Sequence, residues 1–538
     1  MNNRMQKLEA LAIAAVCLLC AVITGYYLIA GYGSYLDADM ASELALAQHL
    51  AEKGALISDS WGYSTEPRVM STQLVFTPLM ALFSGNWRLV RTLGCMILLL
   101  MMAGSMVFCA RSLGAKRRYA CLTAALGILP WSTVYAQMVV IGAFYVPHAV
   151  LTCLLVGLCA RALRAQKGGR YLWAAAFVLA ALMCATSIRY ILCAALPAAA
   201  AGLWMALFPT GGRGLARGSD EARALMLGAL VLTSGAVGYV LGQRALSLVC
   251  TWNMDYMSGS RVTALYNVSL FDLADSAIDG LLKLLGYAEG SRLFSLRGIL
   301  SMGTVLLAAV CVLLFARALR AARGASSVVR FGVLTAVMSA VLTFATFLFV
   351  EGMYLNRYWI PVVSVCLPVL SLCLSAERNT LLRTLCAAAM SVVLLGTGYT
   401  HALYSIDQLE ITPARRQEAR VIADTGVKMG YATFWNANIV TELCDGGVEM
   451  VSITLEKNAQ DQAYPRTSDW LEAQENLGLN MPQEPVLLLL GREEAKSMEA
   501  FLTLCGAQEK ELPTKHRRLF VIASQQAFFD AAQAVAQQ

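Results

Sequence analysis

Apolar runs of about 20 residues recur through residues 1–402 of this chain. A run of this length can cross the roughly 30 Å hydrocarbon layer of a bilayer as a helix. Only helices and closed barrels satisfy their backbone groups in lipid, and continuous rather than alternating apolar residues favour helices. Only 14% of the residues are charged, against roughly 25% in soluble domains. The chain is therefore predicted to be a polytopic membrane protein.

About eleven membrane helices are predicted. The first follows Arg4 and Lys7, and its apolar core is longer than the 7–15 residues or so of a cleaved signal peptide, so it is interpreted as an uncleaved anchor. The predicted spans cover residues 10–31, 89–110, 119–140, 143–163, 171–188, 190–208, 224–246, 297–316, 329–350, 359–375 and 384–402.

Basic residues gather in alternate loops of this plan, on the same side as the N-terminus. By the positive-inside rule that side is the cytoplasm of a multi-pass protein of the cell (plasma) membrane. The outward segments are then residues 32–88, 247–296, 351–358 and 403–538. Within residues 1–402, most of the basic residues behind the net charge of +7 lie in the short loops on the predicted cytoplasmic side. A nucleic-acid partner is not predicted, because no contiguous basic stripe interleaved with aromatics is present.

The composition becomes more polar after residue 402, and predicted strands alternate with predicted helices. This pattern is typical of a small α/β domain. The prediction is thus an all-α membrane domain over 1–402 and an extracytoplasmic α/β domain over 403–538. A disulfide between Cys444 and Cys505 stays open, since nothing in the sequence sets their geometry. The predicted strands are 432–435, 448–454, 485–490 and 518–522; the helical stretches are 411–428, 436–444, 492–504 and 524–535.

The first outer loop, residues 32–88, carries the candidate chemistry. Helical spacing of apolar residues predicts an amphipathic helix at the interface from about residue 40, and residues 72–83 form a second apolar stretch too short to span. Asp37 and Asp39 stand just before the first of these helices. One acid would serve as a helix cap, so the pair favours a functional role. A divalent ion (Mg or Mn) held by Asp37 and Asp39 is an alternative to direct acid–base chemistry.

This order of features resembles the GT-C superfamily of membrane glycosyltransferases, most nearly its protein O-mannosyltransferase and aminoarabinose-transferase branch. In that branch an acidic motif ends the first membrane helix, two interfacial helices follow, and an Arg-containing helix comes next. The branch usually has Asp-Glu where this chain has Asp-Ala-Asp, so Asp37 matches by position and Asp39 is displaced by one. The matching segments are Leu36-Asp37-Ala-Asp39 with Glu43, Gln73-Leu-Val-Phe-Thr-Pro78-Leu, and Trp87-Arg-Leu-Val-Arg91.

The resemblance implies a polyprenyl-phosphate sugar as donor and a cell-envelope glycan, lipid or protein as acceptor. Asp37 is the candidate general base, with Asp39 beside it. Arg189 matches a basic residue near the outer end of the fifth helix, and Arg357-Tyr358 matches an Arg-Tyr segment of a late helix. An arginine can hold a phosphate through its planar fork, although Glu66 and Arg68 can also simply pair with each other. The candidate substrate-binding residues are Tyr63, Glu66, Arg68, His148, Arg189, Arg357 and Tyr358.

A lipid-linked-sugar flippase or another transporter is the main alternative function. Such proteins often contain repeats, broken helices and midplane charges. This sequence has no internal repeat, and its candidate acids lie at the predicted outer surface. A ligase-like enzyme and a non-enzymatic scaffold for envelope assembly are further alternatives.

The predicted orientation can be tested by cysteine labelling. A cysteine placed at Ser34, near Asp37, is expected to react with a membrane-impermeant maleimide on intact cells. A cysteine at Lys116, in the first predicted cytoplasmic loop, is the control and should react only after permeabilisation. The reverse pattern would place Asp37 in the cytoplasm and reject an outward-facing site. Three native cysteines on the predicted outer side are replaced by serine in this background: Cys250, Cys444 and Cys505.

Overall fold

The structure is a computed structural model that describes most of the chain. It divides into two compact units, which we call the helical unit and the mixed unit. The helical unit comprises Met1–Ala30, Cys95–Ala245 and Tyr256–Tyr404; the mixed unit comprises Gly31–Gly94, Leu246–Asp255 and Ser405–Gln538. The described residues are 3–32, 36–165, 169–210, 219–253, 261–262, 269–322, 324, 326–351, 355–408 and 411–538.

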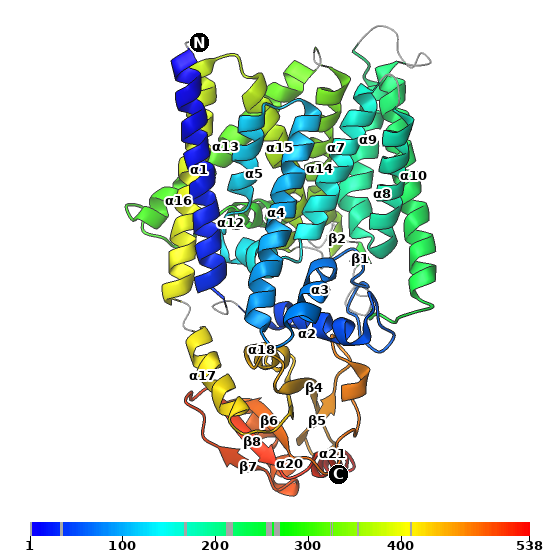
Figure 1. Cartoon of the computed structure of the whole chain (residues 1–538), viewed down its shortest axis with the longest axis vertical. Helices are drawn as coiled ribbons and strands as arrows, with labels where there is room; N and C mark the ends of the chain where they lie inside the picture. The colour runs from blue at the N-terminus through cyan, green and yellow to red at the C-terminus, as the bar shows by residue number, and fades with distance from the viewer. Residues whose placement is uncertain are drawn as a thin grey trace. The chain divides into compact units, whose positions relative to one another are not determined.

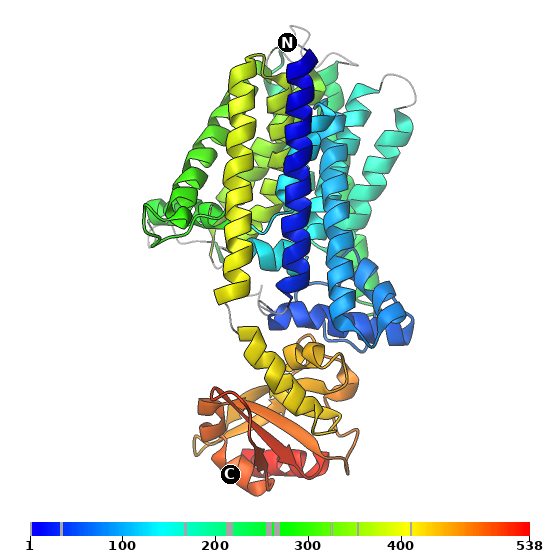
Figure 2. The same ribbon diagram turned by 60° about the vertical axis from the view of Figure 1, so that its left-hand side comes forward.

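Long apolar helices running side by side make up the helical unit (Figures 1 and 2). Eight helices of the described residues are long and apolar enough to cross a membrane. The chain is therefore a multi-pass membrane protein, as predicted. These spans lie in α1 (Asn3–Ala30), α4 (Trp87–Leu113), α7 (Val146–Arg164), α10 (Asp220–Leu246), α13 (Leu296–Ala322), α14 (Ser327–Phe349), α15 (Ile360–Ala376), with the turn before it, and α16 (Thr380–Gln408).

Shorter elements complete the helical unit. Two of them, α8 and the η2–α9 segment, are apolar helices in the predicted spans 171–188 and 190–208. They are α5 (Arg117–Gly127), α6 (Thr133–Tyr135), the π-helical turns η1 (Ala136–Ile141) and η2 (Ile191–Ala195), α8 (Arg170–Thr186), α9 (Leu196–Leu207), α12 (Leu270–Leu284), the 3-10 helix η3 (Asn356–Trp359), and the paired strands β1 (Arg261–Val262) and β2 (Val350–Glu351).

The predicted continuous span over 119–140 is wrong, because the helix is interrupted there. α5 ends at Gly127 and α6 begins at Thr133. Pro130 lies in the gap, and a proline both lacks an N–H and disfavours helical geometry in the residue before it. The Tyr135 hydroxyl donates to the Gly127 carbonyl at 2.5 Å, which satisfies one of the carbonyls freed at the end of α5. The number of membrane crossings, about eleven, stays a prediction.

A six-stranded sheet forms the centre of the mixed unit, in the order β5-β4-β3-β6-β8-β7. β3 is parallel to β4 and β6, and the other pairs are antiparallel. The predicted small C-terminal α/β domain is confirmed. The strands are β3 (Met429–Thr433), β4 (Glu449–Lys457), β5 (Ala463–Thr467), β6 (Val486–Gly491), β7 (Gln508–Lys510) and β8 (Arg517–Ile522); the helices are α17 (Ile411–Ala423), α18 (Ala437–Leu443), the 3-10 turn η4 (Gln474–Asn476), α19 (Arg492–Ser497), α20 (Glu499–Leu504) and α21 (Gln525–Ala536).

Both faces of β6, a central strand of this sheet, are buried. Val486, Leu488 and Leu490 pack with residues of α20 and α21, whereas Leu487 and Leu489 pack with residues of α17 and α18. A strand buried on both faces must be apolar at every position, because its side chains alternate between the two faces. This explains why the run 486–490 is continuously apolar.

The first outer loop belongs to the same unit as the sheet. Its two predicted helices are present as α2 (Ala38–Lys53) and α3 (Gln73–Phe83), which pack against each other. Residues 60–62 pair with residues 471–474 through backbone hydrogen bonds. A Cβ on Gly62 would lie 1.7 Å from the Asp469 carbonyl oxygen, so only glycine permits this approach.

Candidate active site

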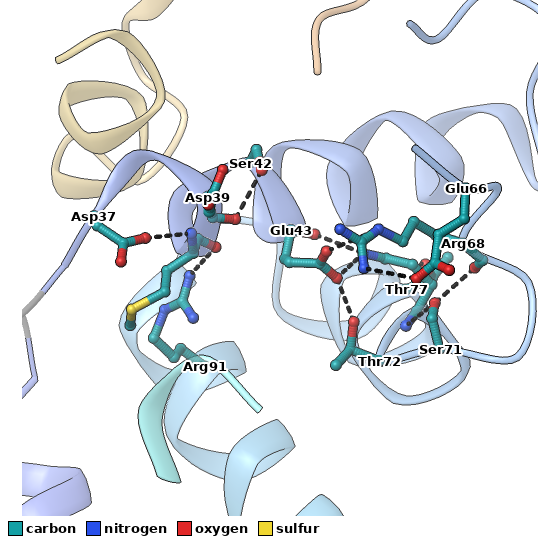
Figure 3. Close-up of polar contacts among 12 residues, drawn as sticks. Asp37, Asp39, Ser42, Glu43, Glu66, Arg68, Ser71, Thr72, Thr77 and Arg91 are labelled. Carbon is teal, nitrogen blue, oxygen red and sulfur yellow. Dashed lines mark hydrogen bonds and ion pairs between the residues drawn. The ribbon is translucent and has the colours of Figure 1, made fainter. Parts of the chain in front are cut away.

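Asp37 is the N-cap residue of α2 (Figure 3). Its Oδ1 accepts a hydrogen bond of 2.8 Å from the Met40 N–H. Asp39 lies in the first turn of the helix, where Ser42 Oγ donates to its carbonyl. Both acids are half-buried. The positive end of the helix dipole favours the charged form of an acid at this position, so capping and reactivity are compatible uses of Asp37.

Glu43, one turn further along α2, is the buried acid of the loop. Its Oε1 lies 3.4 Å from Arg68 Nε, and Gln73 Nε2 donates to its Oε2 at 3.1 Å. The Thr72 hydroxyl donates to the same Oε2 (Figure 3). Glu66 lies further from the guanidinium, with its Oε1 at 3.9 Å from Arg68 Nη1. Glu43 is therefore the closer counter-ion of Arg68 and joins the start of α3 to α2.

A buried ion pair joins the start of α4 to α18 of the C-terminal α/β domain, which we call the sheet domain. Arg91 Nε lies 2.5 Å from Glu442 Oε1 and Arg91 Nη2 lies 2.6 Å from Glu442 Oε2, in a bidentate arrangement. The two side chains are 1% and 0% exposed. Arg91 Nη2 also donates to the Met40 carbonyl at 2.7 Å, and the Tyr32 hydroxyl donates to Glu442 Oε1 at 3.1 Å. Burial and the nearby Glu442 charge raise the pKa of Tyr32 well above its usual value.

Two arginines of α17 hold the backbone that leads into Asp37. Arg415 Nη1 donates to the Leu36 carbonyl at 3.3 Å, and Arg416 Nη2 donates to the Tyr32 carbonyl. Burial lowers the pKa of Arg415, while the Asp37 charge acts in the opposite direction. Arg415 Nε is buried and has no hydrogen-bond partner among the described residues. Arg415 is thus a cation whose charge interacts with that of Asp37.

Tyr63 lies in an apolar cluster of the mixed unit with Trp61 and Leu50. Its hydroxyl accepts from the Ser58 N–H at 3.1 Å, and burial raises its pKa to about 12. These contacts give Tyr63 a packing role in the loop.

The remaining candidates form a second group, in the helical unit. The His148 ring stacks on Tyr190, with centroids 4.6 Å apart and planes 13° apart. Arg189, next to Tyr190, lies with its guanidinium carbon 5.9 Å from the centre of the Tyr358 ring. Arg357 precedes Tyr358 on η3. The structure therefore brings His148, Arg189 and Tyr358 into one neighbourhood of aromatic rings and positive charge.

Metal ligands do not cluster in the described part of the chain. No group of three or more His, Cys, Asp or Glu side chains comes together there as a metal site. Cys444 and Cys505 are present as free thiols.

No protein-family model and no curated protein matches the sequence. Solved structures, however, match its fold. ArnT from Cupriavidus metallidurans bound to undecaprenyl phosphate aligns with a TM-score of 0.53 at 12% identity, over 94% of this chain and 97% of that one. ArnT in its apo state aligns with a TM-score of 0.51 at 13% identity, over 95% of this chain and 98% of that one. The chain has the fold of these ArnT structures. The oligosaccharyltransferase of Archaeoglobus fulgidus, in its apo form, aligns with a TM-score of 0.45 at 10% identity, over 81% of this chain and 64% of that one.

The predicted GT-C-like fold is thus confirmed, whereas two residues beside the acids were not predicted. Glu442 lies on a short helix that is buried almost all round, and nothing local marks its partner Arg91, which lies 351 positions earlier. Arg415 stands in a charged segment that is typical of a solvated helix face. The only available signal for Glu442 was a lone acid within an apolar helix, since such acids are rarely buried unless paired.

Replacing one member of the Arg91–Glu442 pair should destabilise the protein strongly. Arg91→Met or Glu442→Leu alone leaves a buried charge without its partner, at a cost of about 3–5 kcal/mol. The double variant removes both charges and should recover most of the lost melting temperature. Arg466→Met is the matched control, because its partner Glu456 and Arg466 itself are solvent-exposed and such a pair contributes roughly 1 kcal/mol or less. Equal, small shifts in all four variants would contradict this assignment.

Glu472 should make the stability of the mixed unit depend on pH. Its carboxylate accepts from the Ser452 and Ala473 N–H groups, yet burial raises its pKa from 4.5 to about 7. The folded state then binds a proton more tightly than the unfolded state. The contribution of Glu472 to the free energy of unfolding is therefore largest below about pH 4.5. It falls as the pH rises toward 7, by about 3 kcal/mol at most.

The measurement is the melting temperature of the full-length protein between pH 4.5 and 8. Glu472→Gln should flatten part of the decline, and the rest is expected from Glu449 and Glu418, whose pKa values are also raised by burial. Glu484→Gln is a control at an exposed acid of the same domain. An unchanged pH profile in Glu472→Gln would show that this carboxyl does not titrate in the range.

Proposed function

We propose that this protein is a glycosyltransferase that moves a sugar from a polyprenyl-phosphate lipid to an acceptor on the outer face of the membrane. The observation that carries the proposal is the likeness to ArnT, which extends over nearly the whole of both chains. ArnT in that structure is bound to undecaprenyl phosphate. The proposed orientation has a cytoplasmic N-terminus and an extracytoplasmic sheet domain, following the distribution of basic loops.

The reaction is a displacement at the anomeric carbon of the donor sugar. The acceptor hydroxyl oxygen forms the new bond to this carbon, and the bond to the phosphate oxygen breaks. The polyprenyl phosphate leaves with the electron pair, and Asp37 takes the proton of the hydroxyl as general base. A carboxylate suffices for this task because the hydroxyl becomes acidic as the new bond forms.

Positive charge must stabilise the leaving phosphate. Arg415 is suited to this role because it lies beside Asp37 and its Nε has no hydrogen-bond partner among the described residues. Arg68 is already close to Glu43, so we assign it to holding α2 and α3 together. Arg189 and Arg357 of the helical unit are the further candidates for the phosphate.

The donor comes from the bilayer and the acceptor from the exterior. Cytoplasmic loops in the predicted plan are short and contain no Gly-rich phosphate loop, so a cytoplasmic nucleotide sugar is not the expected donor. The acceptor class is a cell-envelope glycan, lipid or protein. A divalent ion at Asp37 and Asp39 would assist the same displacement by neutralising charge on the phosphate. The described residues give no specific support to a flippase function.

Asp37→Asn tests the proposed base. Asparagine caps helices as well as aspartate does, so α2 should form normally while the base is lost. Transfer by the purified protein, reconstituted with a panel of polyprenyl-phosphate sugars, should fall by about 10²–10⁴-fold. Asp39→Asn is the matched control, since it removes a neighbouring acid of the same helix, and should lose less activity. Undiminished transfer by Asp37→Asn, at an unchanged melting temperature, would remove Asp37 from the reaction.

A further inference from the structure

A cleft of about 400 Å³ opens on the sheet domain, between α19 and the β7–β8 hairpin. Most of the residues that line the cleft are basic. Two acids of the hairpin, Glu509 and Glu511, line it as well, together with Leu512 and Thr514. The cations outnumber the acids by six to two. The six basic residues lining the cleft are Arg492, Lys496, Lys510, Lys515, Arg517 and Arg518.

Half of these cations are already neutralised. Arg518 pairs with Glu509, Arg517 pairs with Glu418 at 2.7 Å, and Lys496 pairs with Glu493 at 2.6 Å. The other three form no ion pair within the described part of the chain. Charges gathered within a Debye length of roughly 10 Å add their potentials, so the cleft attracts anions. The three cations without an acidic partner are Arg492, Lys510 and Lys515, all exposed.

The cleft is connected to Asp37 through one acid of α17. Glu418 pairs with Arg517 in the cleft wall and accepts from the Thr514 hydroxyl. The positive charges of Arg517 and Arg415 both act on the Glu418 carboxyl. Arg415 in turn donates to the Leu36 carbonyl, directly before Asp37. Arg517 and Arg415, with the Glu418 carboxyl between them, therefore connect the cleft wall to the backbone next to Asp37.

The lining indicates the kind of anion. None of the described residues that line the cleft is aromatic, whereas single-stranded nucleic acids are bound by aromatic stacking. An amphipathic membrane-binding surface inserts several apolar side chains, and Leu512 is the only aliphatic one here among the described lining residues. Exposed lysines and arginines without apolar neighbours suit a hydrated polyanion.

We infer that this cleft binds an anionic, phosphate-bearing envelope glycan and guides it toward Asp37 as the acceptor. The inference rests on the proposed function and names its acceptor class. Lys510 and Lys515 bind phosphate groups of the glycan chain. The sheet domain is then the acceptor-selecting part of the enzyme.

The test measures binding of inorganic polyphosphate to the full-length protein in nanodiscs of neutral lipid, at two salt concentrations. Lys510→Gln/Lys515→Gln should weaken binding roughly tenfold and lower the slope of log K against log salt by about two. Lys428→Gln/Lys457→Gln is the matched control, since it removes the same charge from exposed lysines outside the cleft. Equal binding by the wild type and the cleft variant would overturn the inference. So would loss of polyphosphate binding in nanodiscs of anionic lipid, because it would assign the cleft to the membrane surface.

A transfer assay separates this inference from the proposed function. With a phosphate-bearing acceptor, the cleft variant should lose about tenfold more activity than with a neutral analogue of the same acceptor. Equal losses on both acceptors would reject the cleft as an acceptor site while leaving glycosyl transfer intact. Conversely, normal polyphosphate binding with no transfer from any donor would reject the proposed function and not the anion site.

Discussion

The ion pair between Arg91 and Glu442 is the constraint on which the mixed unit depends. Each charge is almost completely removed from water, and a lone buried charge costs several kcal/mol. The cost is offset only when both partners meet in the bidentate geometry seen here, with Tyr32 and the Met40 carbonyl completing the hydrogen bonds. Because the partners come from distant parts of the chain, this geometry requires the first turn of α4, the first turn of α2 and α18 to meet.

The position of Asp37 follows from this meeting point. Arg91 holds the Met40 carbonyl, while the Met40 N–H holds the Asp37 carboxylate. Arg415 holds the preceding residue, Leu36, from the other side. An acid at the start of a surface helix would otherwise sample many orientations, and correct orientation can supply several kcal/mol of a reaction barrier. The sheet domain thereby contributes to the candidate site in two ways. It fixes the backbone around Asp37, and it supplies the charged side chains of α17.

Patterns that repeat along the chain were predictable, and isolated contacts were not. The apolar runs predicted the membrane helices, and the apolar run 485–490 predicted a strand. β5 and β7 were missed because one contains Pro465, which is unusual within a strand, and the other is a short polar segment at the sheet edge. The span over 119–140 was predicted as continuous because its hydropathy is high, although Pro130 interrupts the helix.

The sequence alone determined the membrane character of the chain, the polar C-terminal domain and the acids that follow the first helix, because each is a local property of composition or spacing. Tertiary structure alone decided which charges meet. Glu43 became the counter-ion of Arg68, and Arg415 came to lie beside Asp37. Such pairings depend on which charged side chains the fold buries next to each other, and no periodicity in the chain records those contacts.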